Sequence, residues 1–333
     1  MLETGTLGWA IMIGLIVVLL TVDLVLATLR PHAVGFREAA AWSLFYIAVA
    51  MGFGVVFQAQ AGGQYGAEYF AGYLVEKSLS VDNVFVFAII MRTFAVPEKH
   101  QHKALTIGIV TALLLRAVFI ALGATLLELF SFMFLVFGLV LVVTAVQLYR
   151  HRDVDPVIED NLLVRLTRRV LPVSSGYRGG KLVARLDGRR VVTPLFVAIV
   201  AIGSADILFA LDSIPAVFGI TQEPYIVFAA NAFALLGLRA LFFLVKGLLD
   251  RLVYLSTGLS LILAFIGVKL VLHWAHGLSD AVPQIQTSLS LVIIVVVLVV
   301  TTVASLLESR RNPQASAHAG SLRGDRSAKS SSR

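Results

Sequence analysis

The stretch EKSLSVDNVFVF, residues 76–87, places two acids, a lysine and an asparagine inside an otherwise apolar segment. A second stretch, DILFALDSIPAV, residues 206–217, repeats its pattern: an acid, five further residues, then an aspartate followed by a polar residue. Charged side chains are costly inside a bilayer and are usually retained there for function. The doubled pattern is therefore the first candidate for a functional site.

The alignment of the two stretches pairs three polar positions: Glu76 with Asp206, Asp82 with Asp212, and Asn83 with Ser213. Each copy is followed by an apolar span with an arginine, Arg116 in LLLRAVF and Arg239 in LGLRALF. Chance similarity between apolar sequences explains shared leucines and phenylalanines. It does not explain two acids and an arginine in the same order, so we expect an internal repeat.

The composition is that of a membrane protein. Of 333 residues, 58% are hydrophobic and 14% are charged, whereas about a quarter of the residues in a soluble domain are charged. Apolar runs of about 20 residues predict membrane-spanning helices, because lipid cannot satisfy an open backbone. We predict an all-α polytopic membrane protein with about nine transmembrane helices, at roughly 7–29, 40–60, 69–92, 104–125, 128–149, 194–218, 225–247, 251–274 and 286–307.

The connecting loops alternate in charge. Lys and Arg gather in the loops after the first, third, fifth and seventh spans and in the tail, and are absent from the loops between these. The positive-inside rule then gives an outside N-terminus and a cytoplasmic C-terminus. We expect a multi-pass plasma membrane protein with a transmembrane domain over 1–307 and a disordered basic cytoplasmic tail over 308–333.

The cytoplasmic loop at about 150–193 contains two patterned segments. NLLVRLTRRVLPV has the pattern of a basic amphipathic helix at a membrane surface. GGKLVARLDGRRVVTP has the pattern of a β-hairpin that turns at Asp187-Gly188. No basic, aromatic-interleaved domain is present, so we expect no nucleic-acid partner.

The spacing of the repeat fixes its relative orientation. Helices three to five correspond to helices six to eight, an offset of three helices, so equivalent helices cross the membrane in opposite directions. Such a 3+3 inverted-topology repeat is typical of transporters that bind substrate near mid-membrane, between the two halves.

Nine charged residues lie in the predicted spans away from their ends: Asp23, Glu76, Lys77, Asp82, Arg116, Asp206, Asp212, Arg239 and Lys269. Arginine keeps its proton and pairs well with carboxylates, so we expect Arg116 and Arg239, and similarly Lys77 and Lys269, to be charge partners. For Asp82 and Asp212 we favour a functional role, because they occupy matched positions of the repeat. Pro215 removes a hydrogen bond to the carbonyl of Leu211 and is expected to kink or break its helix.

The available ligands are carboxylate, amide, hydroxyl and carbonyl oxygens. These suit Mg²⁺, Ca²⁺ and Mn²⁺ better than thiophilic metals, and the chain has no cysteine. The histidines lie in loops or near helix ends. No nucleophile–base pair or cofactor loop is evident, so we expect a transported cation, no resident cofactor and no enzyme activity.

The segments GYLVEKSLSVDNVFVFAII, TPLFVAIVAIGSADILFALDSIPAVFGIT and NAFALLGLRALFFL resemble the signature segments of the TerC/Alx family of integral membrane proteins. That family is named for tellurium resistance, is similar to LysE-type exporters and is implicated in manganese efflux. The resemblance implies an ion pathway lined by Asp23, Glu76, Asp82, Asn83, Asp206, Asp212 and Ser213, with Glu76, Asp82, Asp206 and Asp212 as metal ligands. Gly203 stands where the family commonly has an acid.

Three functions are consistent with the sequence. The first is export of divalent cations, foremost Mn²⁺, with proton exchange as the candidate coupling. The second is transport of an oxyanion such as tellurite by Arg116 and Arg239. The third is a membrane scaffold that uses the basic loop and tail to dock stress-complex partners or further copies of the chain.

Overall fold

The computed structural model describes residues 5–29, 35–152, 162–174, 176–177, 180–186, 189–245, 253–279 and 282–312. Its elements are α1 (Thr6–Leu29), α2 (Phe36–Ala61), α3 (Gly63–Thr93), α4 (Glu98–Leu129), α5 (Met133–Arg150), α6 (Leu162–Val170), β1 (Val183–Leu186), β2 (Arg189–Val192), α7 (Pro194–Phe218), α8 (Pro224–Leu235), α9 (Leu238–Val245), α10 (Leu255–His276) and α11 (Thr287–Arg311).

The described helices make this an all-α polytopic membrane protein. Eight helical segments in the described part are long and apolar enough to cross a membrane, with α8 and α9 counted together as Pro224–Leu244. The predicted span without a counterpart among the eight is the third, at roughly 69–92, which corresponds to the 31-residue helix α3. Helix α3 is long enough to cross a membrane, but it carries Glu76, Lys77 and Asp82. These charges distinguish it from the eight apolar segments.

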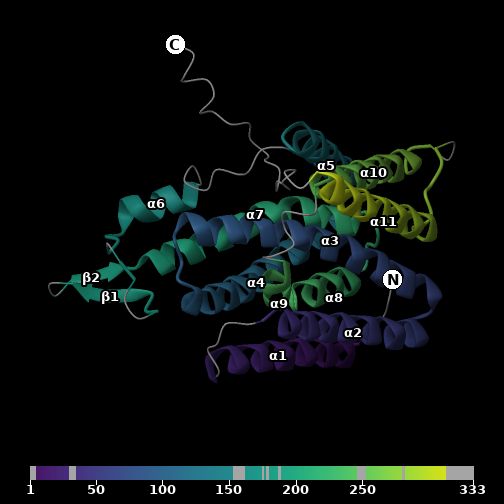
Figure 1. Cartoon of the computed structure of the whole chain (residues 1–333). Helices are drawn as coiled ribbons and strands as arrows, with labels where there is room; N and C mark the ends of the chain where they lie inside the picture. Colours follow the sequence, from purple (N-terminus) through teal and green to yellow (C-terminus); the bar gives the residue numbers. More distant parts are fainter. Residues whose placement is uncertain are drawn as a thin grey trace, which may run out of the picture.

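The long helices lie roughly side by side, with α1 and α2 along one side of the bundle and α5, α10 and α11 along the other (Figure 1). Between them, α4 packs along α7, and α3 packs along both α8 and α7. The most extensive contact joins α5 to α10. The central helices α7 and α8 are the most enclosed of the spans, whereas α1 and α11 expose most of their surface, as lipid-facing helices do.

Helices α5 and α10 approach closely because two glycines meet at their crossing. A Cβ on Gly138 would lie 2.8 Å from the carbonyl oxygen of Gly267, and a Cβ on Gly267 would lie 2.8 Å from the carbonyl oxygen of Gly138. Small residues at such crossings allow the backbones of membrane helices to come into contact. Packing here therefore depends on the absence of both side chains.

The predicted amphipathic helix and hairpin of the 150–193 loop are both present, as α6 and as antiparallel β1 and β2. Both lie at one end of the molecule, beyond the long helices (Figure 1). The predicted turn, Asp187-Gly188, falls outside the described residues, as do residues 313–333 of the predicted tail. Helix α11 continues to Arg311, so the tail begins a turn later than predicted.

The break expected at Pro215 does not occur. Helix α7 continues through Pro215 and ends at Phe218. The proline lies in the last turn, where only one internal hydrogen bond is lost and the helix is about to end.

The seventh predicted span is broken instead. Helix α8 ends at Leu235 and α9 begins at Leu238. Between them, Gly237 has φ +79°, and a Cβ there would lie 2.8 Å from the Cβ of Tyr46. Positive φ and this close contact with α2 both require glycine.

Candidate functional site

Arg116 of α4 is the centre of a buried polar cluster. Its side chain is 1% exposed, and those of Glu76 and Asp206 are fully buried. The guanidinium pairs with Asp206 in a two-bond fork, Nε to Oδ2 at 3.3 Å and Nη2 to Oδ1 at 3.0 Å. Nη1 donates to Glu76 Oε1. The two acids that the repeat aligns therefore share one arginine.

Two asparagines complete the shell around the guanidinium. Nη1 of Arg116 donates to Asn231 Oδ1 of α8 at 2.7 Å. With its amide oxygen facing the arginine, Asn83 accepts from Nη2 at 3.2 Å and donates to the carbonyl of Leu79 at 3.1 Å. A guanidinium has five N–H donors, and each is used here once.

Several buried side-chain oxygens of α3 and α7 lack a hydrogen-bond partner in the described part of the chain. Glu76 Oε2, Ser80 Oγ and Ser213 Oγ are in this state. Buried polar atoms normally have partners, and Glu76 and Ser80 lie one turn apart on the same face of α3. The orphan atoms are thus oxygen acceptors with capacity for a cation or a proton.

The second arginine of the repeat makes a different ion pair. Arg239 Nη2 of α9 lies 2.6 Å from Asp23 Oδ1 of α1, and the Tyr46 hydroxyl donates to the same oxygen at 3.1 Å. This contact ties the first turn of α9 to α1 and α2. Asp23, an expected pathway residue, thus pairs with Arg239 in this structure.

Lys77 also lies at the broken helix. Its Nζ donates to the carbonyl oxygen of Ala234, in the last turn of α8, at 3.2 Å. Within the described residues no carboxylate forms an ion pair with it. A cation is well placed there, because the last carbonyls of a helix lack internal partners and carry partial negative charge.

Asp212 lies on α7 near the Arg116 cluster but is not one of the hydrogen-bond partners of Arg116. Its side chain is half-buried and neighbours the exposed Leu211 on α7. No ion pair to it is present among the described residues, although Arg116 and Asp206 are close enough to act on it electrostatically. The side chain of Asp82 lies outside the described parts. Among described residues, no three His, Cys, Asp or Glu side chains gather as a metal site would require.

A cavity of about 680 Å³ opens between the start of α3, the end of α7 and the start of α11. Glu68 in its wall is 7% exposed and accepts from the Thr221 hydroxyl at 2.6 Å. Lys269, an expected charge partner, lines the same cavity and interacts electrostatically with Glu68. This buried acid was missed because its segment reads as a polar loop, whereas α3 already begins at Gly63.

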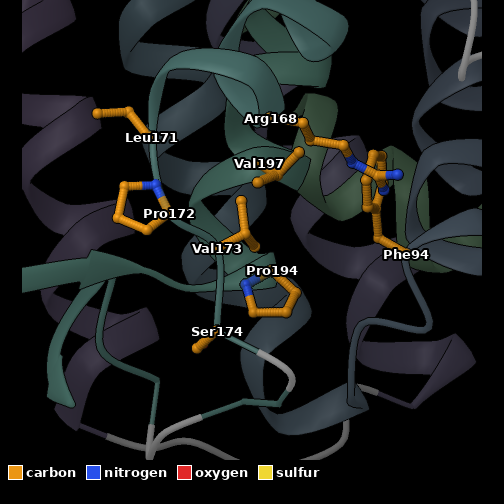
Figure 2. Close-up of a pocket in the computed structure, with 8 residues that line it drawn as sticks. All are labelled: Phe94, Arg168, Leu171, Pro172, Val173, Ser174, Pro194 and Val197. Carbon is orange, nitrogen blue, oxygen red and sulfur yellow. The ribbon is translucent and has the colours of Figure 1, made fainter. Parts of the chain in front are cut away.

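A second cavity, of about 480 Å³, lies between α6, the first turn of α7 and the end of α3 (Figure 2). Its lining is mostly apolar, and Arg168 lies over the ring of Phe94 at 5.4 Å. Nearby, the Tyr177 hydroxyl donates to the Phe94 carbonyl at 2.6 Å, and burial raises the pKa of Tyr177, which keeps that proton in place. None of the described residues that line this cavity is a carboxylate.

Asn231 and Tyr46 are further site residues that the sequence reasoning did not select. Asn231 is the only polar side chain within α8 between Tyr225 and Leu235, which is a usable signal. Tyr46 gives no signal, because its role depends on contact with α1 and α9.

Comparison with known proteins agrees with these features. The profile of a family described as "Integral membrane protein TerC family" matches residues 61–313. An uncharacterized membrane protein of Mycobacterium tuberculosis is 44% identical over 322 residues, which covers 92% of this chain and 81% of that protein. One from Myxococcus xanthus is 39% identical over 311 residues, covering 93% and 95%.

A plant relative carries a more informative name. The thylakoid membrane protein TERC of Arabidopsis thaliana chloroplasts is 40% identical over 228 residues, covering 68% of this chain and 59% of that protein. No solved structure matches. With the family profile covering most of the helical bundle, the chain belongs to the integral membrane protein TerC family.

Proposed function

We propose that this protein is a plasma membrane transporter that exports divalent metal cations, foremost Mn²⁺, in exchange for protons. The cation passes a mid-membrane site on α3 and α7 that includes Glu76, Asp206, Asp82 and Asp212. Membership of the TerC family supports a membrane transporter. The choice of cargo depends on the chemistry of the buried cluster.

The observation that carries this proposal is the orphan oxygen of Glu76. Two fully buried carboxylates share one guanidinium, and Glu76 Oε2 has no hydrogen-bond partner among the described residues. An uncompensated buried carboxylate oxygen is costly unless a cation or a proton reaches it. Hydroxyl oxygens of Ser80 and Ser213 are in the same state, and all are hard donors suited to Mn²⁺. A carboxylate that is alternately protonated and metal-bound also provides an exchange mechanism.

The helix contacts support an inverted repeat. If α3, α4 and α5 are equivalent to α7, α8–α9 and α10, then the contact of α4 with α7 is equivalent to that of α8 with α3. Both contacts are present and similarly extensive, and α5 with α10 forms its own equivalent pair. Transporters of this construction place substrate sites between the repeats.

The geometry favours a cation over an oxyanion. All donors of Arg116 are used by Glu76, Asp206, Asn231 and Asn83. An oxyanion at Arg116 would have to displace a carboxylate from a fully buried pair. Tellurite binding at Arg116 would need a guanidinium N–H that has no other partner, and Arg116 has none in the described cluster.

The proposal is tested by metal accumulation in manganese-sensitive cells. Cells that express the wild-type protein should hold less Mn²⁺ and survive higher external Mn²⁺ than cells with an empty vector. Asp82→Asn and Asp212→Asn should each remove most of that protection. Glu128→Gln, at an exposed acid near the end of α4, is the control and should protect as the wild type does.

Protein amounts in the membrane are compared by immunoblot for every variant. If both aspartate variants reach the membrane in normal amounts and still protect the cells fully, the assignment of these residues fails. If the wild type changes no divalent metal content, export itself is wrong.

A further inference from the structure

We propose that the carbonyl end of α8 is a second cation-binding position, which the Lys77 ammonium occupies in this conformation and which a divalent cation takes when it displaces the lysine. This inference depends on the proposed function, since it assigns a new element of the same transport site. The ligand is a hard divalent cation bound by backbone carbonyl oxygen.

The break between α8 and α9 creates this position. Helix α8 stops at Leu235, and the amide of Leu236 donates to the Ala232 carbonyl at 2.9 Å. The Ala234 carbonyl, two residues further along the chain, accepts from Lys77 Nζ at 3.2 Å. Carbonyls at the C-terminal end of a half-helix are known cation ligands in transporters with broken helices. Here a positive charge already sits on one of them.

The break is held from both sides, so the position is a lasting feature of the fold. Gly237 packs against Tyr46, whose hydroxyl donates to Asp23, and Asp23 pairs with Arg239 in the first turn of α9. The start of α9 is thereby attached to α1 and α2, whereas the end of α8 is attached to α3 through Lys77. Release of Lys77 frees only the α8 end.

The lysine and the cargo compete for one oxygen. The Lys77 ammonium donates to the Ala234 carbonyl, and no carboxylate forms an ion pair with it among the described residues. Two positive charges at one carbonyl oxygen repel strongly in a poorly solvated interior, so a divalent cation that binds this oxygen must displace the ammonium. The lysine is therefore a tethered competitor of the cargo.

The charged groups on the neighbouring elements have partners of their own. Glu76 on α3 and Arg116 on α4 are paired in the central cluster, and Arg239 on α9 pairs with Asp23. The side chain of Asp82 lies outside the described parts. Among the described residues, Lys77 forms no ion pair with a carboxylate and donates to the Ala234 carbonyl instead.

The test measures Mn²⁺ binding to purified full-length protein in lipid nanodiscs by calorimetry at pH 7. Lys77→Met keeps the apolar stem and removes the charge, so Mn²⁺ should bind about tenfold more tightly than to the wild type at pH 7. Lys77→Arg keeps a permanent charge next to the carbonyl, so Mn²⁺ should bind about tenfold more weakly. Lys103→Met is the matched control, since Lys103 also donates to a backbone carbonyl, that of Gly180 at 2.9 Å.

The two Lys77 variants separate competition from a structural role. If the lysine only caps α8, Lys77→Met and Lys77→Arg should bind Mn²⁺ as the wild type does, whereas competition for the Ala234 carbonyl moves the two affinities in opposite directions.

Equal Mn²⁺ affinities for the wild type and Lys77→Met overturn the proposal. If Lys77→Met aggregates, Lys77→Arg decides: unchanged Mn²⁺ affinity in that variant shows that Lys77 only caps the helix. A wild-type protein that binds Mn²⁺ but gives cells no protection contradicts export and leaves this inference standing. A wild type that binds no divalent cation contradicts both.

Discussion

At the scale of the residue, Arg116 joins three helices through one side chain. Its partners come from α3, α7 and α8, and all are at least nine-tenths buried. Removal of one partner from a buried ion pair leaves an uncompensated charge, which costs more than the pair itself contributes. The arginine is therefore required for folding, whatever else the site does.

Arg116→Gln is expected to destabilise the protein by about 3–5 kcal/mol, the usual cost of breaking a buried pair. The measurement is thermal unfolding in detergent, followed by tryptophan fluorescence. Arg310→Gln, at an exposed arginine in the last turn of α11, is the control and should melt as the wild type does. An unchanged melting temperature for Arg116→Gln would contradict the described cluster.

The sequence predicts the members of this cluster better than their pairing. Glu76, Asp206 and Arg116 stand out because ionised groups are rare in apolar spans. That one guanidinium would hold both repeat-related acids does not follow from spacing, because it depends on how α3, α4 and α7 cross. The partner of Arg239 is Asp23 of α1, outside the repeat, for the same reason.

At the scale of the element, the decisive feature is where a helix is interrupted. Pro215 is expected to kink or break α7, yet the helix continues through it, because the proline lies in the final turn, where few internal hydrogen bonds remain to be lost. A single glycine in an apolar span does not by itself predict a helix break, yet Gly237 has the positive φ that separates α8 from α9. The sequence does not tell whether a glycine in an apolar span continues the helix or breaks it. The answer depends on the side chain that packs against it, here Tyr46.

Gly237→Ala is expected to destabilise the protein, since positive φ costs an alanine about 1–2 kcal/mol and the added methyl group would crowd Tyr46, at about 1–3 kcal/mol more. Gly52→Ala on α2 is the matched control, because nothing lies within 4 Å of a Cβ there. Thermal unfolding of both variants tests this directly. Equal stability of the two would show that the chain passes through residue 237 without strain.

At the scale of the whole molecule, hydropathy and charge predict the bundle almost completely, because lipid imposes helices wherever the backbone crosses. The ends of helices are less predictable, and α4 extends to Glu98–Leu129 where a shorter span was expected. Polar ends such as those of α3 and α4 extend beyond the apolar core, and hydropathy alone does not detect them. Glu68 was missed for this reason.

Membrane orientation can be measured directly because the chain has no cysteine. Gln284→Cys, before α11, should react with an impermeant maleimide in intact cells, as the outside assignment of this loop predicts. Lys99→Cys, at the start of α4, should react only after the cells are permeabilised. Both positions are exposed, so reactivity reports the side of the membrane. The opposite labelling pattern would invert the topology.

The most direct test of the account is Mn²⁺ flux into vesicles that contain only the purified protein. A Mn²⁺-quenched dye inside the vesicles reports entry, with an outward proton gradient imposed. The account predicts entry with the wild type and with Glu128→Gln, and strongly reduced entry with Asp212→Asn. Flux no faster than that of protein-free vesicles, in a wild-type preparation that is folded and monodisperse, would contradict it.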